Sequence, residues 1–356
     1  MIPTDEAIAP ATALAEVERR LAAFFDDARA RSRDRHPRFE ELWLATRAAA
    51  TGGKRLRPRL VVAPYLLLDG APLPPAIELA VAIELLHTAL LLHDDVIDGD
   101  VERRGAPNVA GTFERAAVEA GAPRRVAQGW GVSAAILAGD LMLTSALRLV
   151  AGRRVDEDRR ERIVDLVDES VFRAAAGELA DVAYAAGLDT PSASAIRQMM
   201  ADKTAHYSLE LPLRAAAILA GSPEPLGERL GAIGRSLGLV FQMRDDLLGV
   251  FGRSEETGKS TVGDLREGKR TLLIAFADGT AEWTAVAADF GNADLDEAGA
   301  QRLRDALESS GARDRLEAEM RRECGIAHRL IDEAGLPDRL AHLLATEVDD
   351  AAERCA

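Results

Sequence analysis

The sequence predicts an all-α protein, built as one domain whose acidic helix ends open into one cavity. Two observations carry this prediction. Apolar residues recur at helical spacing along most of the 356-residue chain, while strict polar/apolar alternation is almost absent. Aromatic residues make up only 4% of the chain, so the β-branched and aromatic runs typical of strands are scarce.

The helices are expected to follow one another with short turns between them. The expected helices span 11–32, 38–51, 56–69, 75–98, 125–151, 156–186, 192–220, 225–251, 268–277, 297–308, 312–334 and 337–353. Turn residues separate several of them, as in DGAPLPP and GSPEP. Two longer polar loops are expected at 99–124 and 252–268. Residues 1–10 are expected to form a flexible N-terminus, and residues 11–356 a single domain.

Composition excludes several classes of protein. The net charge of −15 argues against nucleic acid as a partner. Only two cysteines, Cys324 and Cys355, are present, so neither a disulfide framework nor a four-cysteine zinc site can form. The start of the sequence lacks a secretory signal, and the longest apolar stretch carries Glu84, His87 and His93. We therefore expect a soluble cytoplasmic protein without a transmembrane segment.

An acidic motif follows that apolar stretch, in LLHDDVIDGDVERRG (91–105). Asp94 and Asp98 are four residues apart, which places both carboxylates on one helix face. A second aspartate pair, Asp245-Asp246, lies near the end of another apolar helix. Magnesium prefers oxygen ligands and is often held by one or two carboxylates together with substrate phosphates. A single acidic helix end is commonly just solvated, but two of them favour a diphosphate site.

Basic residues gather in four short clusters: GGKRLRP (52–58), RRG (103–105), DKT (202–204) and TGKSTVGDLREGK (257–269). The TGKS stretch is not a phosphate-binding P-loop, because Gly252 lies one residue too far from Gly258 and follows a helix. For any one of these cations a plain surface charge is the simplest interpretation. In GGKRLRP the two glycines let the backbone approach an anion, while Lys54 and Arg57 lie about one helical turn apart.

The ordered set GGKRLRP, LLHDDVIDGDVERRG, DKTAHYS, FQMRDD and TGKS-GDLREGK resembles the trans-isoprenyl diphosphate synthase (polyprenyl synthetase) family, most of all its bacterial geranylgeranyl diphosphate synthases. The resemblance implies the isoprenoid synthase fold, a single-domain helical bundle around a deep central cavity, usually a homodimer. It also implies a prenyltransferase that joins an allylic diphosphate to isopentenyl diphosphate, head to tail. The cofactor would be Mg²⁺, with as many as three ions bridging the allylic diphosphate.

The resemblance assigns roles to individual residues. Metal binding falls to Asp94, Asp98 and Asp245, with Asp95 in support. The isopentenyl diphosphate would be held by Lys54, Arg57, His87 and Arg104. The allylic diphosphate would be held by Arg103, Lys203, Thr204, Gln242, Lys259 and Lys269. The residues expected to be catalytic are Asp94, Asp98, Arg103, Lys203 and Asp245. No side-chain base is evident, so the proton is expected to leave with the released diphosphate.

The sequence departs from the family pattern in three places. Gly249 replaces the last aspartate of the second acidic motif, so water or Asp246 is expected to complete that ion's shell. Glu178 stands for the glutamine of a GQxxD pattern, which leaves Asp181 a supporting role. A histidine often found soon after RRG is absent.

Small side chains upstream of Asp94 bear on product length. In the family, large aromatic residues five or four positions before this aspartate stop growth at fifteen carbons. Here Ala89 and Leu90 occupy those positions, and Leu86 follows one turn further. We expect geranylgeranyl diphosphate, with a farnesyl or longer-chain product as the alternative. A terpene cyclase or a non-catalytic partner subunit on the same fold remains open.

Overall fold

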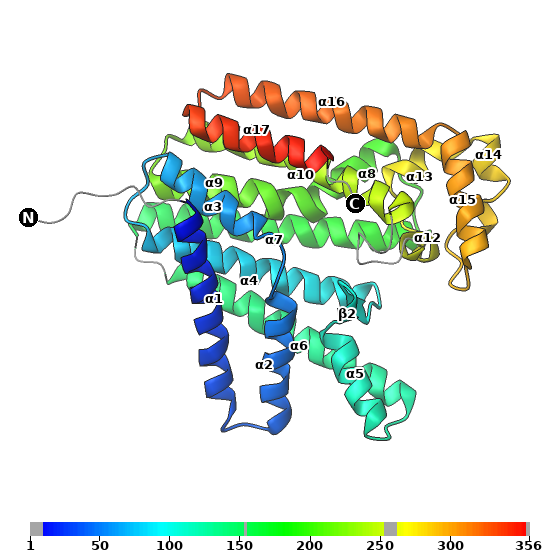
Figure 1. Cartoon of the computed structure of the whole chain (residues 1–356), viewed down its shortest axis with the longest axis horizontal. Helices are drawn as coiled ribbons and strands as arrows, with labels where there is room; N and C mark the ends of the chain where they lie inside the picture. Colours follow the sequence, from blue (N-terminus) through cyan, green and yellow to red (C-terminus); the bar gives the residue numbers. More distant parts are fainter. Residues whose placement is uncertain (1–9, 153–154, 253–261, 354–356) are drawn as a thin grey trace, which may run out of the picture. The chain divides into compact units, whose positions relative to one another are not determined.

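The computed structural model describes residues 10–152, 155–252 and 262–353, and within these ranges the fold is almost entirely helical (Figure 1). The all-α prediction is confirmed. The first elements are α1 (Pro10–Ser32), α2 (Pro37–Ala50), α3 (Leu56–Leu67), α4 (Pro74–Ile97), β1 (Glu102–Arg103), β2 (Ala106–Pro107), α5 (Val109–Glu119), α6 (Arg124–Ala151), α7 (Glu157–Ala185), α8 (Ala193–Met200), η1 (Ala201–Glu210) and α9 (Leu211–Ala220). The remaining elements are α10 (Glu224–Phe251), α12 (Gly263–Glu267), α13 (Leu272–Ala277), α14 (Ala281–Thr284), η2 (Ala287–Asp289), α15 (Glu297–Ser309), α16 (Ala312–Glu333) and α17 (Asp338–Glu353).

These elements form two compact units. The first unit comprises residues 1–165 and 215–223, and the second comprises 166–214 and 224–356. No linker or break in composition marks this division in the sequence, and the expected single domain over 11–356 stays a prediction. The expected flexible start falls on residues of which only Pro10 is described.

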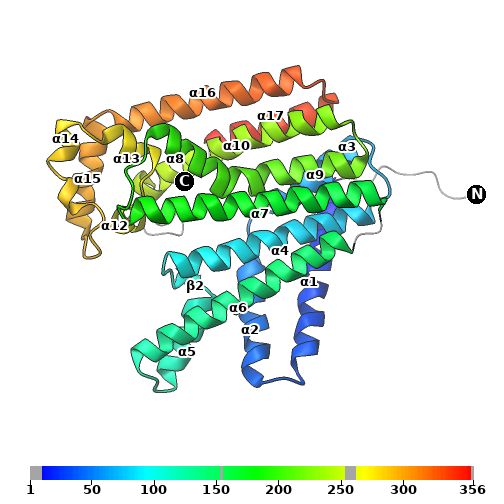
Figure 2. The same ribbon diagram turned by 180° about the vertical axis from the view of Figure 1, so that it is seen from behind.

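In the first unit, α4 is the central helix. It packs against α1, α3 and α6, and its buried positions run almost without interruption, from Ala76 to Leu92. In both views α4 and α6 lie side by side and run in opposite directions (Figures 1 and 2). Small residues on α6 make this approach possible: a Cβ at Gly139 would overlap the His93 ring of α4. The carboxyl end of α4 is thereby fixed against α6.

The second unit is built around α10, which packs against η1, α16 and α17. Glycines again allow close contact, because a Cβ at Gly234 would meet the backbone of Glu210 and one at Gly238 would overlap Ala205. Both positions lie where α10 crosses η1. The helix α10 is therefore held rigidly up to its acidic end.

Several expectations about elements were wrong, among them the loop expected at 252–268, which contains the short helix α12. The expected loop at 99–124 contains the hairpin β1–β2 and the helix α5, which begins where Asn108 accepts a hydrogen bond from the Gly111 amide at 2.8 Å. The expected helix at 192–220 is interrupted by η1, a π-helix. The helix expected from 268 begins only at Leu272, because Gly268 takes a left-handed conformation that ends α12.

By length and composition alone, two helices among the described residues could cross a membrane. They are α4 and α6. Most of the apolar window of α4 is buried, as in the core helix of a globular protein, whereas α6 keeps much of its own exposed.

Candidate active site

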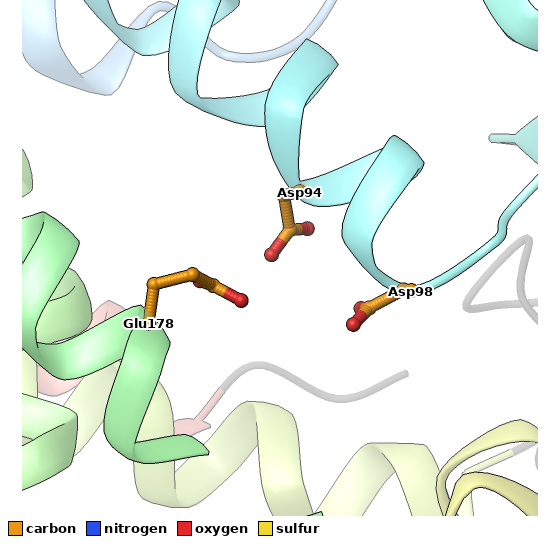
Figure 3. Close-up of side chains that lie close together, drawn as sticks. All are labelled: Asp94, Asp98 and Glu178. Atoms are coloured by element: carbon orange, nitrogen blue, oxygen red, sulfur yellow. The ribbon is translucent and has the colours of Figure 1, made fainter. Parts of the chain in front are cut away.

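The carboxyl end of α4 carries the first acidic motif. Asp94 and Asp98 lie one turn apart on the same face, with carboxylate oxygens within 4.8 Å of one another, and Figure 3 shows both side chains projecting from that face. The helix ends at Asp98, and Gly99 follows with a positive φ of 72°. Both carboxylates are partly exposed. Oxygen donors in this arrangement fit a divalent cation such as magnesium.

Arg103, from β1, holds this acidic end in place. Its Nε donates to Asp95 Oδ1 at 2.7 Å, and its Nη2 lies 3.1 Å from Asp94 Oδ2. Asp95 is only 3% exposed. Burial raises the pKa of Asp95, although the charge of Arg103 and its hydrogen bond oppose that rise. The buried Asp95 therefore anchors Arg103, while Asp94 and Asp98 face outward.

Cationic side chains form a cluster, here called the Arg104 cluster, beside the GGKRLRP segment of the same unit. The Arg104 guanidinium lies against the glycine loop, with Nη2 3.4 Å from an ideal Cβ at Gly53, and Nη1 donates to Thr51 O at 3.4 Å. Desolvation, followed by the nearby charges of Arg57 and Arg104, holds the pKa of His87 well below its ordinary value. Of the residues assigned to isopentenyl diphosphate, Arg57, His87 and Arg104 thus come together. Lys54 is exposed at the start of this segment.

Arg55, in the middle of this segment, has a different role. Its backbone is left-handed, with φ 49°, and its side chain turns inward. There it pairs with Glu18 of α1 and with Glu84 of α4, the latter at 2.5 Å. Arg55 therefore fixes the loop between α2 and α3, so that the cations on either side are held in position.

In the second unit, Lys203 of η1 lies between two carboxylates of α7. Its Nζ is 2.7 Å from Asp181 Oδ2 and 2.9 Å from Glu178 Oε2. A Cβ at Gly177 would overlap the Lys203 backbone, so glycine is required for this approach. Figure 3 includes Glu178 on α7. π-Helical turns often occur at functional sites, and the first turn of η1 contains this lysine and its neighbour Thr204, which is partly exposed.

The end of α10 carries the second acidic motif. Asp245 is exposed, whereas Asp246 is 7% exposed and accepts a hydrogen bond from Gln242 Nε2 at 3.0 Å. Burial raises the pKa of Asp246 to about 8; the Gln242 bond opposes this rise, while the charges of Asp264 and Asp245 add to it. Asp246 is thus poorly suited to hold a full negative charge without a nearby cation.

The remaining assigned cations belong to the segment after α10. Lys269 forms an ion pair with Glu267 at 3.1 Å, just beyond α12. Lys259 lies outside the described residues.

The three residues assigned to product length lie on α4, and two of them are buried. Ala89 is 0% and Leu86 1% exposed, and Leu90 is partly exposed. On the antiparallel α6, Met142 follows the His93-facing Gly139 by about one turn and is also fully buried. No aromatic side chain stands at these positions on either helix.

The structure adds two acidic residues to the site. The sequence pattern marks Glu178 as a departure from the family, but does not indicate that it pairs with Lys203. The sequence alone assigns no role to Asp264, which lies against Gly249 of α10. Its place inside the GDLREGK stretch was the available signal.

A helical fold that presents paired carboxylates at one helix end and clustered guanidinium groups beside a glycine loop defines a class of enzymes acting on diphosphates through divalent cations. The comparisons with known proteins then narrow this class. The family described as polyprenyl synthetase matches residues 43–285. The chain belongs to the polyprenyl synthetase family.

Individual relatives agree with this membership. A (2E,6E)-farnesyl diphosphate synthase of Mycobacterium tuberculosis is 33% identical over 301 residues, which cover 81% of this chain and 76% of that protein. A geranylfarnesyl diphosphate synthase of Aeropyrum pernix is 33% identical over 64% of this chain and 66% of its own length. A crystal structure of geranylgeranyl pyrophosphate synthase from Corynebacterium glutamicum, complexed with isoprenyl diphosphate and magnesium, superposes with a TM-score of 0.88 at 28% identity, covering 95% of this chain and 97% of that one.

Proposed function

We propose that this chain catalyses the magnesium-dependent, head-to-tail condensation of an allylic diphosphate with isopentenyl diphosphate to give geranylgeranyl diphosphate. The observation that carries the proposal is the presence of two separate kinds of anion-binding group. Paired carboxylates suit a metal-bound diphosphate, and the Arg104 cluster beside the glycine loop suits a second diphosphate bound without metal.

The isopentenyl diphosphate is assigned to the Arg104 cluster of the first unit. Arg57 and Arg104 would donate to its phosphate oxygens, and Lys54 would add a mobile point charge. The lowered pKa of His87 keeps its imidazole neutral at neutral pH, so it would donate one N–H without adding charge. Arg55 is a positioning residue, because it binds the two glutamates instead of a ligand.

The allylic diphosphate is assigned to the acidic helix ends and their attendant cations. Asp94, Asp98 and Asp245 would hold magnesium, whose positive charge stabilises the departing diphosphate. Arg103 and Lys203 would donate to the phosphate oxygens as the C–O bond breaks. The side chains of Arg103 and Lys203 are already oriented by ion pairs with carboxylates, so they would need little reorganisation when the diphosphate leaves.

Further cations and polar groups complete this assignment: Thr204, Gln242, Lys259 and Lys269. The carbocation formed next requires an apolar, dry environment. Isopentenyl diphosphate attacks it through its double bond, and the proton then lost is taken up by the released diphosphate.

Product length is assigned to the buried face of α4. The growing tail would pass Ala89, which is too small to stop it, and reach Leu86 one turn further, roughly 4.5 Å along the axis. That distance corresponds to about one more isoprene unit and favours a twenty-carbon product over a fifteen-carbon one.

Incubating the pure chain with magnesium, isopentenyl diphosphate and each allylic diphosphate in turn tests the proposal. Mass spectrometry of the dephosphorylated products should show a C20 alcohol. A hydrocarbon formed without isopentenyl diphosphate would identify a cyclase instead. The absence of any product, with normal binding of both substrates, would identify a non-catalytic subunit.

We further propose that the chain acts in the cytoplasm as a homodimer, joined through the outer face of α6. That face exposes large apolar side chains, including Trp130 at 40%, Ile136 at 41% and Leu137 at 55%, while the inner face is lined by small residues. Exposed apolar area of this kind commonly marks an interface. Leu137→Glu should shift the mass in light scattering from dimer to monomer, whereas Leu44→Glu, at a site on α2 that is 43% exposed, should not.

A further inference from the structure

The acidic end of α10 lacks one carboxylate. Gly249 is four residues after Asp245, so both positions lie on the same helix face. In the resembled family an aspartate often stands at the position of Gly249. The helix α10 alone therefore offers one carboxylate ligand fewer than the family pattern.

The space above Gly249 is already filled by another carboxylate. A Cβ built at Gly249 would overlap Asp264 Oδ2, with Asp264 Cγ at 3.2 Å. A carboxylate oxygen of Asp264, which belongs to α12, therefore occupies the space that the Cβ of a side chain at position 249 would need.

Asp264 is held in this place by its own short helix. Its carbonyl accepts hydrogen bonds from the amides of Gly268 and Lys269, the latter at 3.0 Å, and the next residue, Leu265, is 1% exposed. Asp264 is also one of the charges that act on the buried Asp246. Three carboxylates therefore gather around one turn of α10, a grouping that a divalent cation would stabilise.

We propose that Asp264 supplies the oxygen ligand, direct or through water, that Gly249 does not provide to the second magnesium-binding helix end. Gly249 is required in turn, because any side chain there would displace this carboxylate. The inference rests on the proposed function only in taking magnesium and a diphosphate as the ligands.

The geometric half of the proposal is tested by stability. Gly249→Ala removes a glycine from a helix, a change that by itself stabilises the helix. In the unaltered chain the new methyl group must displace the Asp264 carboxylate, so the gain in Tm should be smaller there than in the Asp264→Ala background, as a double-mutant cycle would reveal. Equal changes in both backgrounds would overturn the assigned contact.

The ligand half is tested by calorimetric titration of magnesium into the protein with inorganic diphosphate present. Asp264→Asn, which keeps the size of the side chain, should weaken magnesium binding about tenfold or more. Asp305→Asn on α15, an exposed aspartate far along the chain, should leave it unchanged. Unchanged binding in Asp264→Asn would overturn the proposal.

A further test moves the carboxylate from position 264 to position 249 and compares the magnesium binding of the variants. Gly249→Asp combined with Asp264→Ala should recover magnesium binding to within about threefold of the unaltered chain, whereas Asp264→Ala alone should not. If the double variant binds magnesium no better than Asp264→Ala does, the proposal that Asp264 replaces an aspartate at position 249 is refuted. Because these titrations need no prenyl product, failure of the proposed reaction would be seen separately, as absence of product from the unaltered chain.

Discussion

Replacing Arg104 by alanine should weaken isopentenyl diphosphate binding while sparing the fold. Within the described residues Arg104 forms no ion pair, and its one hydrogen bond, to Thr51 O, is long at 3.4 Å. Removing its side chain should therefore change the free energy of unfolding by less than about 0.5 kcal/mol. The Arg104 guanidinium lies against the glycine loop at Gly53, and within the described residues most of its N–H groups make no hydrogen bond, so they are available to a ligand.

The size of the kinetic effect follows from this contact. A hydrogen bond to a charged group contributes about 1.5–3 kcal/mol, which corresponds to roughly 10- to 150-fold in an equilibrium constant. The KM for isopentenyl diphosphate should rise by that factor, and the KM for the allylic substrate by less than about threefold. Arg103→Ala should differ, because Arg103 binds Asp94 and Asp95 and its loss disturbs the metal-binding end of α4.

Steady-state kinetics with each substrate varied in turn would measure both constants. Arg19→Ala is a suitable control, because Arg19 is 74% exposed and, among the described residues, pairs only with Glu16 one turn away. Equal rises in both KM values for Arg104→Ala, or no rise in either, would refute the assignment of the Arg104 cluster to isopentenyl diphosphate.

Three further predictions concern the metal site, product length and acid stability. Asp94→Asn or Asp98→Asn should abolish turnover, while the Tm without magnesium holds or rises because like charges are removed; near-normal activity would count against the metal site. Ala89→Phe should shift the product from C20 to C15 and Leu86→Ala should lengthen it, as read by mass spectrometry; an unchanged distribution would mean that another surface measures the chain. Burial alone would raise the pKa of Glu210, but hydrogen bonds from His206 and Arg235 lower it from 4.5 to about 2. Its stabilising contribution is thus present above pH 4.5 and lost as the pH falls toward 2, about 3 kcal/mol in all; urea unfolding should show this loss in the unaltered chain and not in Glu210→Gln.

The all-α fold and the acidic end of α4 could be predicted because they depend on local spacing. The i, i+4 relation of Asp94 and Asp98 is a property of any helix, and the polar pattern after it follows from the sequence alone. The helix α5 was missed although Asn108, a strong N-cap residue, precedes an amphipathic stretch. That error came from reading a polar segment as a loop.

The partners of the site cations could not be predicted in the same way. The pairing of Lys203 with Glu178 depends on a close approach of α7 to η1 at Gly177, which no local pattern encodes. The same holds for Asp264, whose contact with Gly249 depends on how the chain returns after α10. Sequence comparison shows Gly249 only as a missing aspartate, whereas the structure shows which side chain fills its place.

Isotopic labelling of isopentenyl diphosphate tests the central claim, condensation of two diphosphates at two different sites, most directly. With magnesium, an allylic primer and labelled isopentenyl diphosphate, the product should carry one labelled five-carbon unit for each diphosphate released. Omitting the primer or the magnesium should abolish both signals. An unlabelled product, or release of diphosphate from the primer without incorporation of label, would contradict the account.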